Sequence, residues 1–196
     1  MTVTCDITVS SDGFAAGPNQ SLEHPLGEGG ERLHRWMMEL ADENAAEIAA
    51  IVDAGAFVMG RNMFGPGRGE WDHEWTGWWG EDPPYHAPVF VLTHHPRAPL
   101  VMEGGTTFTF VTDGIESAME QARLVAGDRT VAIAGGASTV RQYLSAGLIE
   151  ELRLHVAPVV LRAGEPLLEG LDGVTLEQVS SVERDLVTHV TYRVVH

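Results

Sequence analysis

The sequence predicts one α/β domain of three layers, α/β/α, built on a mostly parallel central sheet. Strand-like and helix-like patterns alternate along most of the 196 residues, which is typical of parallel sheets covered by helices. Two long alternating segments, 174–182 and 186–195, close the chain and predict an antiparallel hairpin. Hydrophobic residues make up 44% of the chain, enough for one sizeable core, so we expect a single domain over 1–196.

Apolar periodicity, together with the glycines and prolines between periodic segments, places the individual elements. Strands are expected at residues 2–10, 56–59, 88–93, 107–111, 129–134, 151–160, 174–182 and 186–195. Helices are expected from about Glu31, over 43–53, over 115–125 and from Ser138 to a stop at Gly147. Residues 11–30 are expected to form a glycine-rich mobile loop, and the irregular tryptophan-rich stretch 64–88 is long enough to suggest a functional loop.

Composition excludes several classes of protein. The formal net charge of −16 argues against nucleic acid or an anionic membrane surface as a partner, because both need a cationic face. No apolar run could span a membrane and the polar start lacks a signal peptide, so we expect a cytoplasmic protein. Cys5 is the only cysteine, which excludes an intramolecular disulfide and a zinc site built on several thiolates. Every basic residue is arginine, so a bound phosphate must rely on guanidinium and backbone N–H groups.

The segment 131–140 carries the most informative pattern. A short apolar strand breaks at Gly135-Gly136 and opens into an amphipathic helix that begins with Ser138 and Thr139. Glycines let a bound group approach the backbone, and the first helical turn presents unpaired N–H groups and the positive end of the helix dipole. The sequence therefore indicates an anion site, although a tight strand-to-helix turn with nothing bound explains the same residues.

Three further loops, which begin near Ser10, Gly60 and Thr93, leave the carboxyl ends of strands, where open α/β sheets bind ligands. Gly60-Arg61 ends one strand at a helix start, so Arg61 is expected either to bind an anion or to cap a neighbouring carbonyl. Thr93 and His94 end another, and their donors could reach a ribose or an extra phosphate. Adjacent histidines in an extended loop point apart, so no metal site is expected.

Five motifs follow one another along the chain: Ser11-x-Gly13, Val58-Met-Gly-Arg61, Val91-Leu-Thr93, Ile133-Ala-Gly-Gly136 and Ala157-Pro158 before the hairpin. In this order they resemble the dihydrofolate-reductase fold. More narrowly, they are similar to the reductase domain of bifunctional riboflavin-biosynthesis deaminase/reductases and to its single-domain bacterial relatives. The resemblance covers nearly the whole chain, and no deaminase motif accompanies it.

The resemblance implies that the chain binds NADPH as its cofactor. It implies that the loop 12–17 covers the nicotinamide, with the backbone at Ala15 or Ala16 meeting the carboxamide. By the same resemblance, the adenosine and its phosphates would lie against Gly60, Arg61, Asn62, Thr93 and His94. The pyrophosphate would be held by Gly135, Gly136, Ala137, Ser138 and Thr139.

The implied reaction is hydride transfer to a C=N or C=O of a small heterocyclic, pterin- or pyrimidine-like substrate. Asp12 and Glu31 are the candidate proton donors, although Asp12 also suits a turn and Glu31 also suits a helix N-terminus. Phe14, Trp36 and the tryptophan-rich loop are candidates for an aromatic wall around the substrate, although Trp36 equally suits the core. Arg35 is a candidate for binding a substrate phosphate or is a surface charge.

A different class of function fits the same residues: a non-catalytic protein that binds a nucleotide, a flavin or a drug-like aromatic compound in the same cleft. The edge strands of the C-terminal hairpin need covering, so we also expect a homodimer.

Overall fold

The computed structural model describes residues 1–72 and 74–195. Over these residues the chain forms one large sheet and a small two-stranded one. The large sheet contains β1 (Val3–Ser10), β3 (Ala56–Gly60), β4 (Pro88–Leu92), β5 (Leu100–Val101), β6 (Thr107–Val111), β7 (Val131–Gly135), β8 (Glu151–Ala157), β10 (Thr175–Arg184) and β11 (Val187–Val195). The small sheet pairs β2 (Phe14–Ala16) with β9 (Glu165–Pro166).

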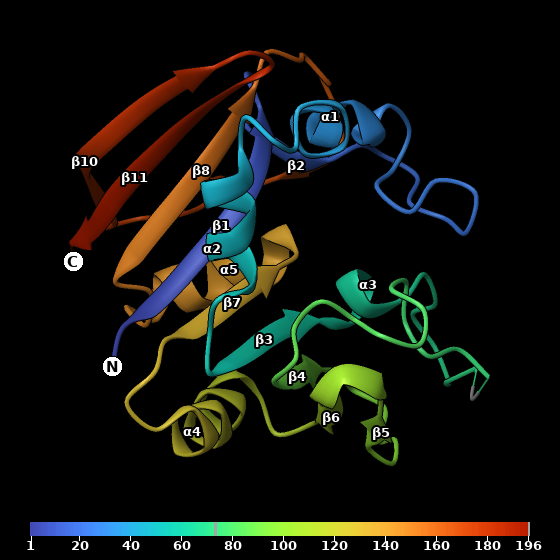
Figure 1. Cartoon of the computed structure of the whole chain (residues 1–196). Coiled ribbons are helices and arrows are strands. Elements are labelled where there is room, and N and C mark those ends of the chain that lie inside the picture. The colour runs from blue at the N-terminus through green and yellow to red at the C-terminus, as the bar shows by residue number, and fades with distance from the viewer. Residues whose placement is uncertain (73, 196) are drawn as a thin grey trace.

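The strand order of the large sheet is β10-β11-β8-β1-β7-β3-β4-β6-β5 (Figure 1). Its six middle strands, from β8 to β6, run parallel. The last two strands of the chain form an antiparallel hairpin that pairs through β11 with β8. The predicted fold class, a mostly parallel α/β sheet with a C-terminal antiparallel hairpin, is therefore confirmed.

Helices and one long loop cover the sheet. The helical segments are η1 (Gly30–His34), α1 (Arg35–Glu39), α2 (Ala45–Val52), α3 (Arg61–Phe64), η2 (Glu103–Gly105), α4 (Ile115–Ala126) and α5 (Ala137–Ser145). On one face α4 and α5 bury Met119, Val140 and Tyr143 against Val58 and Ile133. None of these helices is long and apolar enough to cross a bilayer.

Different parts of the chain cover the two halves of the opposite face. Trp36 of α1 packs against His155 of β8 in a tilted arrangement, with the ring centroids 4.9 Å apart, and against His189 of β11 edge to face, with the ring centroids 5.0 Å apart. The long loop that follows α3 covers β3 and β6, where Tyr85 lies 4.9 Å from Phe57 between ring centroids. The second outer layer is therefore part helix and part tryptophan-rich loop.

The segment after β1 is more ordered than the predicted mobile loop. Its strand β2 pairs with β9, and the amide of Leu167 donates to the carbonyl of Gly13 at 2.9 Å. Farther along, Gly17 donates to the carbonyl of Leu26 at 2.8 Å, and a Cβ at Gly17 would collide with the backbone of Glu28. This close backbone approach requires glycine and folds the segment back on itself.

Candidate functional site

A cavity of about 810 Å³ lies across the carboxyl ends of the parallel strands. Its lining comes from β1, β7, β3, β4 and β6 and from the loops that follow them. The loops after β1 and α3 project from the same side of the molecule, as Figure 1 shows in blue and green. These five strands are neighbours in the order β1-β7-β3-β4-β6. At about 4.8 Å between neighbouring strands they span roughly 19 Å, so the cavity suits an elongated ligand.

The middle of the cavity is formed by α5 and the end of β3. The first hydrogen bond of α5 runs from the amide of Val140 to the carbonyl of Gly136 at 3.1 Å, so the three preceding amides lie before the helical ladder. These amides belong to Ala137, Ser138 and Thr139, all of which line the cavity. A Cβ at Gly60 would collide with the Thr139 hydroxyl, so glycine lets β3 approach this turn. A cis peptide bond joins Gly135 to Gly136.

Arg61 lies toward the β4–β6 end of the cavity, with its guanidinium carbon 3.1 Å from the centre of the Trp71 ring. Its Nε and Nη1 atoms are buried donors, and neither has a hydrogen-bond acceptor among the described residues. Burial lowers the pKa of Arg61, and the nearby charge of Arg97 lowers it further. An anion beside Arg61 would both supply the missing acceptor and offset this repulsion.

The tryptophan-rich loop completes this end of the cavity. Trp71 is 7% exposed and donates its indole N–H to the carbonyl of His95 at 2.7 Å. Trp75 donates to the carbonyl of Phe64 at 2.9 Å, which ties the loop to α3. Trp78 and Trp79 then line the cavity directly. The loop is therefore a wall of the site.

The cavity lining has a charge opposite to that of the whole chain. The chain carries a formal net charge of −16, yet two arginines, Arg61 and Arg68, line the cavity together with three histidines. Glu165 is the single acidic residue in the lining, counted over the part of the chain that the structure describes. Such a contrast favours a bound anion.

The opposite end of the cavity lies between β1 and β2, where Thr8, Ala15 and Ala16 contribute to the lining. The preceding turn is fixed by Asp12, whose carboxylate accepts the Ser10 hydroxyl at 2.6 Å and the Arg162 amide at 2.8 Å. The Ser10 hydrogen bond is the main reason why the pKa of Asp12 is lowered to about 2, with the two backbone amides contributing. Asp12 is thereby held as a carboxylate that anchors the segment.

The structure brings most of the predicted site residues together. Eleven of them line the cavity: Ala15, Ala16, Gly60, Arg61, Asn62, Thr93, His94, Gly136, Ala137, Ser138 and Thr139. Six do not contribute to its lining: Asp12, Phe14, Glu31, Arg35, Trp36 and Gly135.

Local contacts explain the position of three residues outside the lining. Arg35 is half exposed and forms an ion pair with Glu39 one helical turn away, at 2.8 Å. Glu31 is exposed in η1, near the amino end of that turn. Trp36 is fully buried against two histidines, as the core interpretation of its apolar stripe expected.

The sequence prediction missed His34, which lines the cavity at the β1–β2 end. The expected α-helix from Glu31 is instead a 3-10 turn followed by the short α1, and this changes the direction of the side chains. The sequence does contain a signal for this position: His34 lies between Leu33 and Trp36, two apolar residues that the structure buries.

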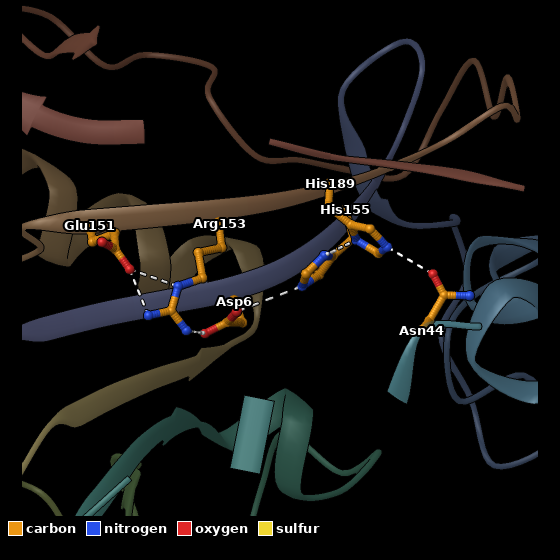
Figure 2. A network of polar contacts seen from close by, with 6 residues as sticks. All are labelled: Asp6, Asn44, Glu151, Arg153, His155 and His189. Atoms are coloured by element: carbon orange, nitrogen blue, oxygen red, sulfur yellow. Dashed lines mark hydrogen bonds and ion pairs between the residues drawn. The ribbon is translucent and has the colours of Figure 1, made fainter. Parts of the chain in front are cut away.

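A network of polar contacts joins residues of β1, β8, β11 and the segment just before α2 (Figure 2). Asn44 donates to the carbonyl of Leu40 at 2.8 Å, which leaves its Oδ1 to accept from Nε2 of His189 at 2.8 Å. Nδ1 of neutral His189 then accepts from Nδ1 of His155, also at 2.8 Å. Nε2 of His155 lies 3.7 Å from Oδ1 of Asp6, whose Oδ2 accepts from Nη1 of Arg153 at 3.4 Å.

Comparisons with known proteins agree with this geometry. The model of the RibD C-terminal domain matches residues 1–190. The uncharacterised protein YyaP of Bacillus subtilis (strain 168) is 23% identical over 175 residues, which cover 84% of this chain and 79% of YyaP.

Two solved structures share the fold. A protein from Shewanella sp. PV-4 assigned to riboflavin biosynthesis superposes with a TM-score of 0.67 at 22% identity, covering 100% of both chains. Dihydrofolate reductase from Enterococcus faecalis, solved with NADP(H) and RAB-propyl, superposes with a TM-score of 0.59 at 14% identity, covering 98% of this chain and 96% of the other.

Proposed function

Since this chain belongs to the RibD C-terminal domain family, we propose that it is an NADPH-dependent reductase acting on a small heterocyclic substrate of the pterin or pyrimidine type. The bond reduced is a C=N or a C=O. Family membership and a shared fold with reductases support the general class of oxidoreductase. The choice of cofactor and substrate class is our proposal.

The observation that carries the proposal is a line of anion donors along one elongated cavity. Ala137, Ser138 and Thr139, whose amides precede the hydrogen-bond ladder of α5, and Arg61, whose Nε and Nη1 lack an acceptor among the described residues, belong to the same lining. Together they fit the phosphates of a dinucleotide, without any lysine. The cluster of arginine and histidine around Arg61 favours NADPH over NADH, because only NADPH carries a phosphate on its adenosine ribose.

When bound, NADPH supplies a hydride from C4 of its reduced nicotinamide and leaves as NADP⁺. The protein's part is to bind, orient and exclude water. Ala15 and Ala16 lie where they can hold the nicotinamide end, since β2 is fixed by pairing with β9. Trp78 and Trp79 remove water from the other end, which strengthens the interactions of the arginines there.

Steady-state oxidation of NADPH across a panel of pterins, pyrimidines and quinones tests the reaction. We expect turnover with at least one heterocycle, at a rate higher with NADPH than with NADH. Micromolar binding of NADPH without turnover on any compound would instead favour the alternative, a non-catalytic protein that holds a nucleotide, flavin or drug-like ligand in this cleft.

We also propose a homodimer, because β10 is an outer strand of the large sheet and such edges are commonly covered. Light scattering at micromolar concentration checks this directly. A species of twice the 21.2 kDa chain mass is expected, and a species of the chain mass would contradict it.

A further inference from the structure

We infer that His34 is the catalytic acid of this site, and that its imidazolium gives the substrate the proton that accompanies hydride transfer. The inference rests on the proposed reductase function and names the group that completes it. Asp12 and Glu31, the two acids predicted from the sequence, do not line the cavity, whereas His34 does.

The position of His34 places it at the end of the cavity expected to hold the nicotinamide and the substrate. Its segment η1 packs against β1 and β2. The same end of the lining contains Thr8 of β1 and Ala15 and Ala16 of β2. A group at this end of the cavity lies where the proposed reaction takes place.

The surroundings of the imidazole leave one nitrogen available. Nδ1 of His34 is buried, and no described residue forms a hydrogen bond with it, so Nε2 is the nitrogen left to meet a ligand. Burial lowers the pKa of His34 and the neighbouring His155 lowers it further, while the carbonyl of Gly30 acts in the opposite direction. The anionic phosphates of a nucleotide bound in the cavity would raise the pKa of His34. Nucleotide binding therefore favours the protonated imidazole that acts as the acid.

The charged neighbours of His34 come from each element around it. The elements that pack against its segment η1 are α1, β1 and β2. The charged residues of η1 and these elements are Glu31, Arg32, Arg35, Glu39 and Asp6, and β2 has none. His155 of β8 also acts on the charge of His34. His155 is held in place by its hydrogen bond to His189, as Figure 2 shows.

The competing acid is Glu165, which lines the cavity opposite Ala16 in the β2–β9 pair. In ordinary surroundings an imidazole keeps its proton to a higher pH than a carboxyl group does, and the phosphates of a bound nucleotide would offset the lowering of the His34 pKa by burial. The half-buried position of His34 also protects its proton from bulk water.

The proposed step balances in atoms and electrons. The substrate carbon gains the hydride with its two electrons, and the electron pair of the former double bond moves to nitrogen or oxygen. That atom takes a proton from Nε2 of the His34 imidazolium. The imidazole, then neutral, regains a proton from solvent before the next turnover.

Proton titration of the histidine side chains by NMR tests the inference without relying on turnover. The signals are followed in the free protein and in its NADPH and NADP⁺ complexes, with His34→Gln identifying the His34 signal and His24→Gln identifying that of an exposed histidine. We expect the His34 midpoint to rise with NADPH. With NADP⁺ it should lie roughly half a pH unit or more lower than with NADPH, because the oxidised nicotinamide ring is cationic.

The outcomes separate the inference from the proposed function. Saturating binding of both nucleotides with one and the same His34 midpoint would overturn the inference alone. Absence of any binding heat would overturn the proposed function and the inference with it. A different His34 midpoint in the two complexes, with the His24 midpoint unchanged, supports both.

Turnover on any accepted heterocycle adds a second readout. We expect His34→Gln to lower kcat roughly 10² to 10⁴-fold at neutral pH with little change in NADPH affinity, and His24→Gln to leave kcat unchanged. The remaining rate should lose its dependence on pH between 5 and 8. Loss of kcat in Glu165→Gln but not in His34→Gln would assign the acid to Glu165 and contradict the inference.

Discussion

At the scale of single residues, Gly60 shows how one missing side chain allows the site to form. A Cβ at this position would collide with the Thr139 hydroxyl at the start of α5. We expect Gly60→Ala to lower the free energy of unfolding by about 1 to 3 kcal/mol, because the surrounding core is closely packed. Urea denaturation measures this change. Gly69→Ala is the matched control, since a Cβ there would meet no atom within 4 Å, and an equal loss in both variants would refute the explanation.

Arg61 is the second informative residue, because its buried Nε and Nη1 lack a hydrogen-bond acceptor in the part of the chain described. We expect Arg61→Gln to weaken NADPH binding by roughly 10- to 100-fold, the range of one or two hydrogen bonds to a charged group. Binding calorimetry gives the affinity. Arg129→Gln is the control, because it removes an arginine that is 61% exposed and paired with Asp53. The affinity of this variant for NADPH should equal that of the unchanged protein.

At the scale of elements, β2 depends on contacts that are distant in sequence. Asp12 accepts hydrogen bonds from the amides of Leu161 and Arg162, and so fixes the segment before β2 against the segment before β9. We expect Asp12→Asn to speed hydrogen exchange at these two amides and to weaken nucleotide binding. Asp185→Asn, in the exposed turn of the hairpin, should change neither property. Unchanged exchange in Asp12→Asn would show that β2 is held by other contacts.

This anchor has a defined dependence on pH. The pKa of Asp12 is lowered from 3.8 to about 2, chiefly by the Ser10 hydroxyl, so the folded state favours the carboxylate. Its stabilising effect is therefore complete above pH 3.8 and is lost as the pH falls through about 2. Between pH 7 and 5 the exchange protection at Leu161 and Arg162 should stay constant.

The sequence alone predicted the elements whose signals are local. The glycine pair between β7 and α5 and the alternating hairpin strands each depend on neighbouring residues, and the structure has both. The order within 11–18 was missed, because β2 is held by β9 from a segment about 150 residues later. The network of His155 and His189 was missed for the same reason, since these residues meet only in the register of β8 with β11.

At the scale of the whole molecule, buried histidines link stability to pH. Burial is the main cause that lowers the pKa of both His34 and His189, so these groups are neutral in the folded state where the unfolded chain is protonated. The unfolded state then binds more protons, and their stabilising effect, present above about pH 6.5, is lost as the pH falls. Each proton contributes a slope of at most about 1.4 kcal/mol per pH unit.

Urea denaturation between pH 7.5 and 5.5 checks this linkage. The formal net charge of −16 destabilises the folded state by repulsion, and protonation at lower pH relieves that repulsion in every variant. The test is therefore the difference in stability between each variant and the unchanged protein at each pH. We expect His34→Gln to lose less stability on acidification than the unchanged protein, and His24→Gln to follow the unchanged protein. Parallel curves for all three proteins would contradict the buried, neutral state of His34.

The whole molecule combines a strongly acidic surface with a cavity lined by arginine, histidine and free amides. This contrast is the basis of the proposed cofactor site, and titration calorimetry with NADPH tests it most directly. We predict saturable heat at one site per chain, with micromolar affinity, a rise in the melting temperature, and weaker binding of NADH. No heat and no thermal protection at millimolar NADPH would contradict the account.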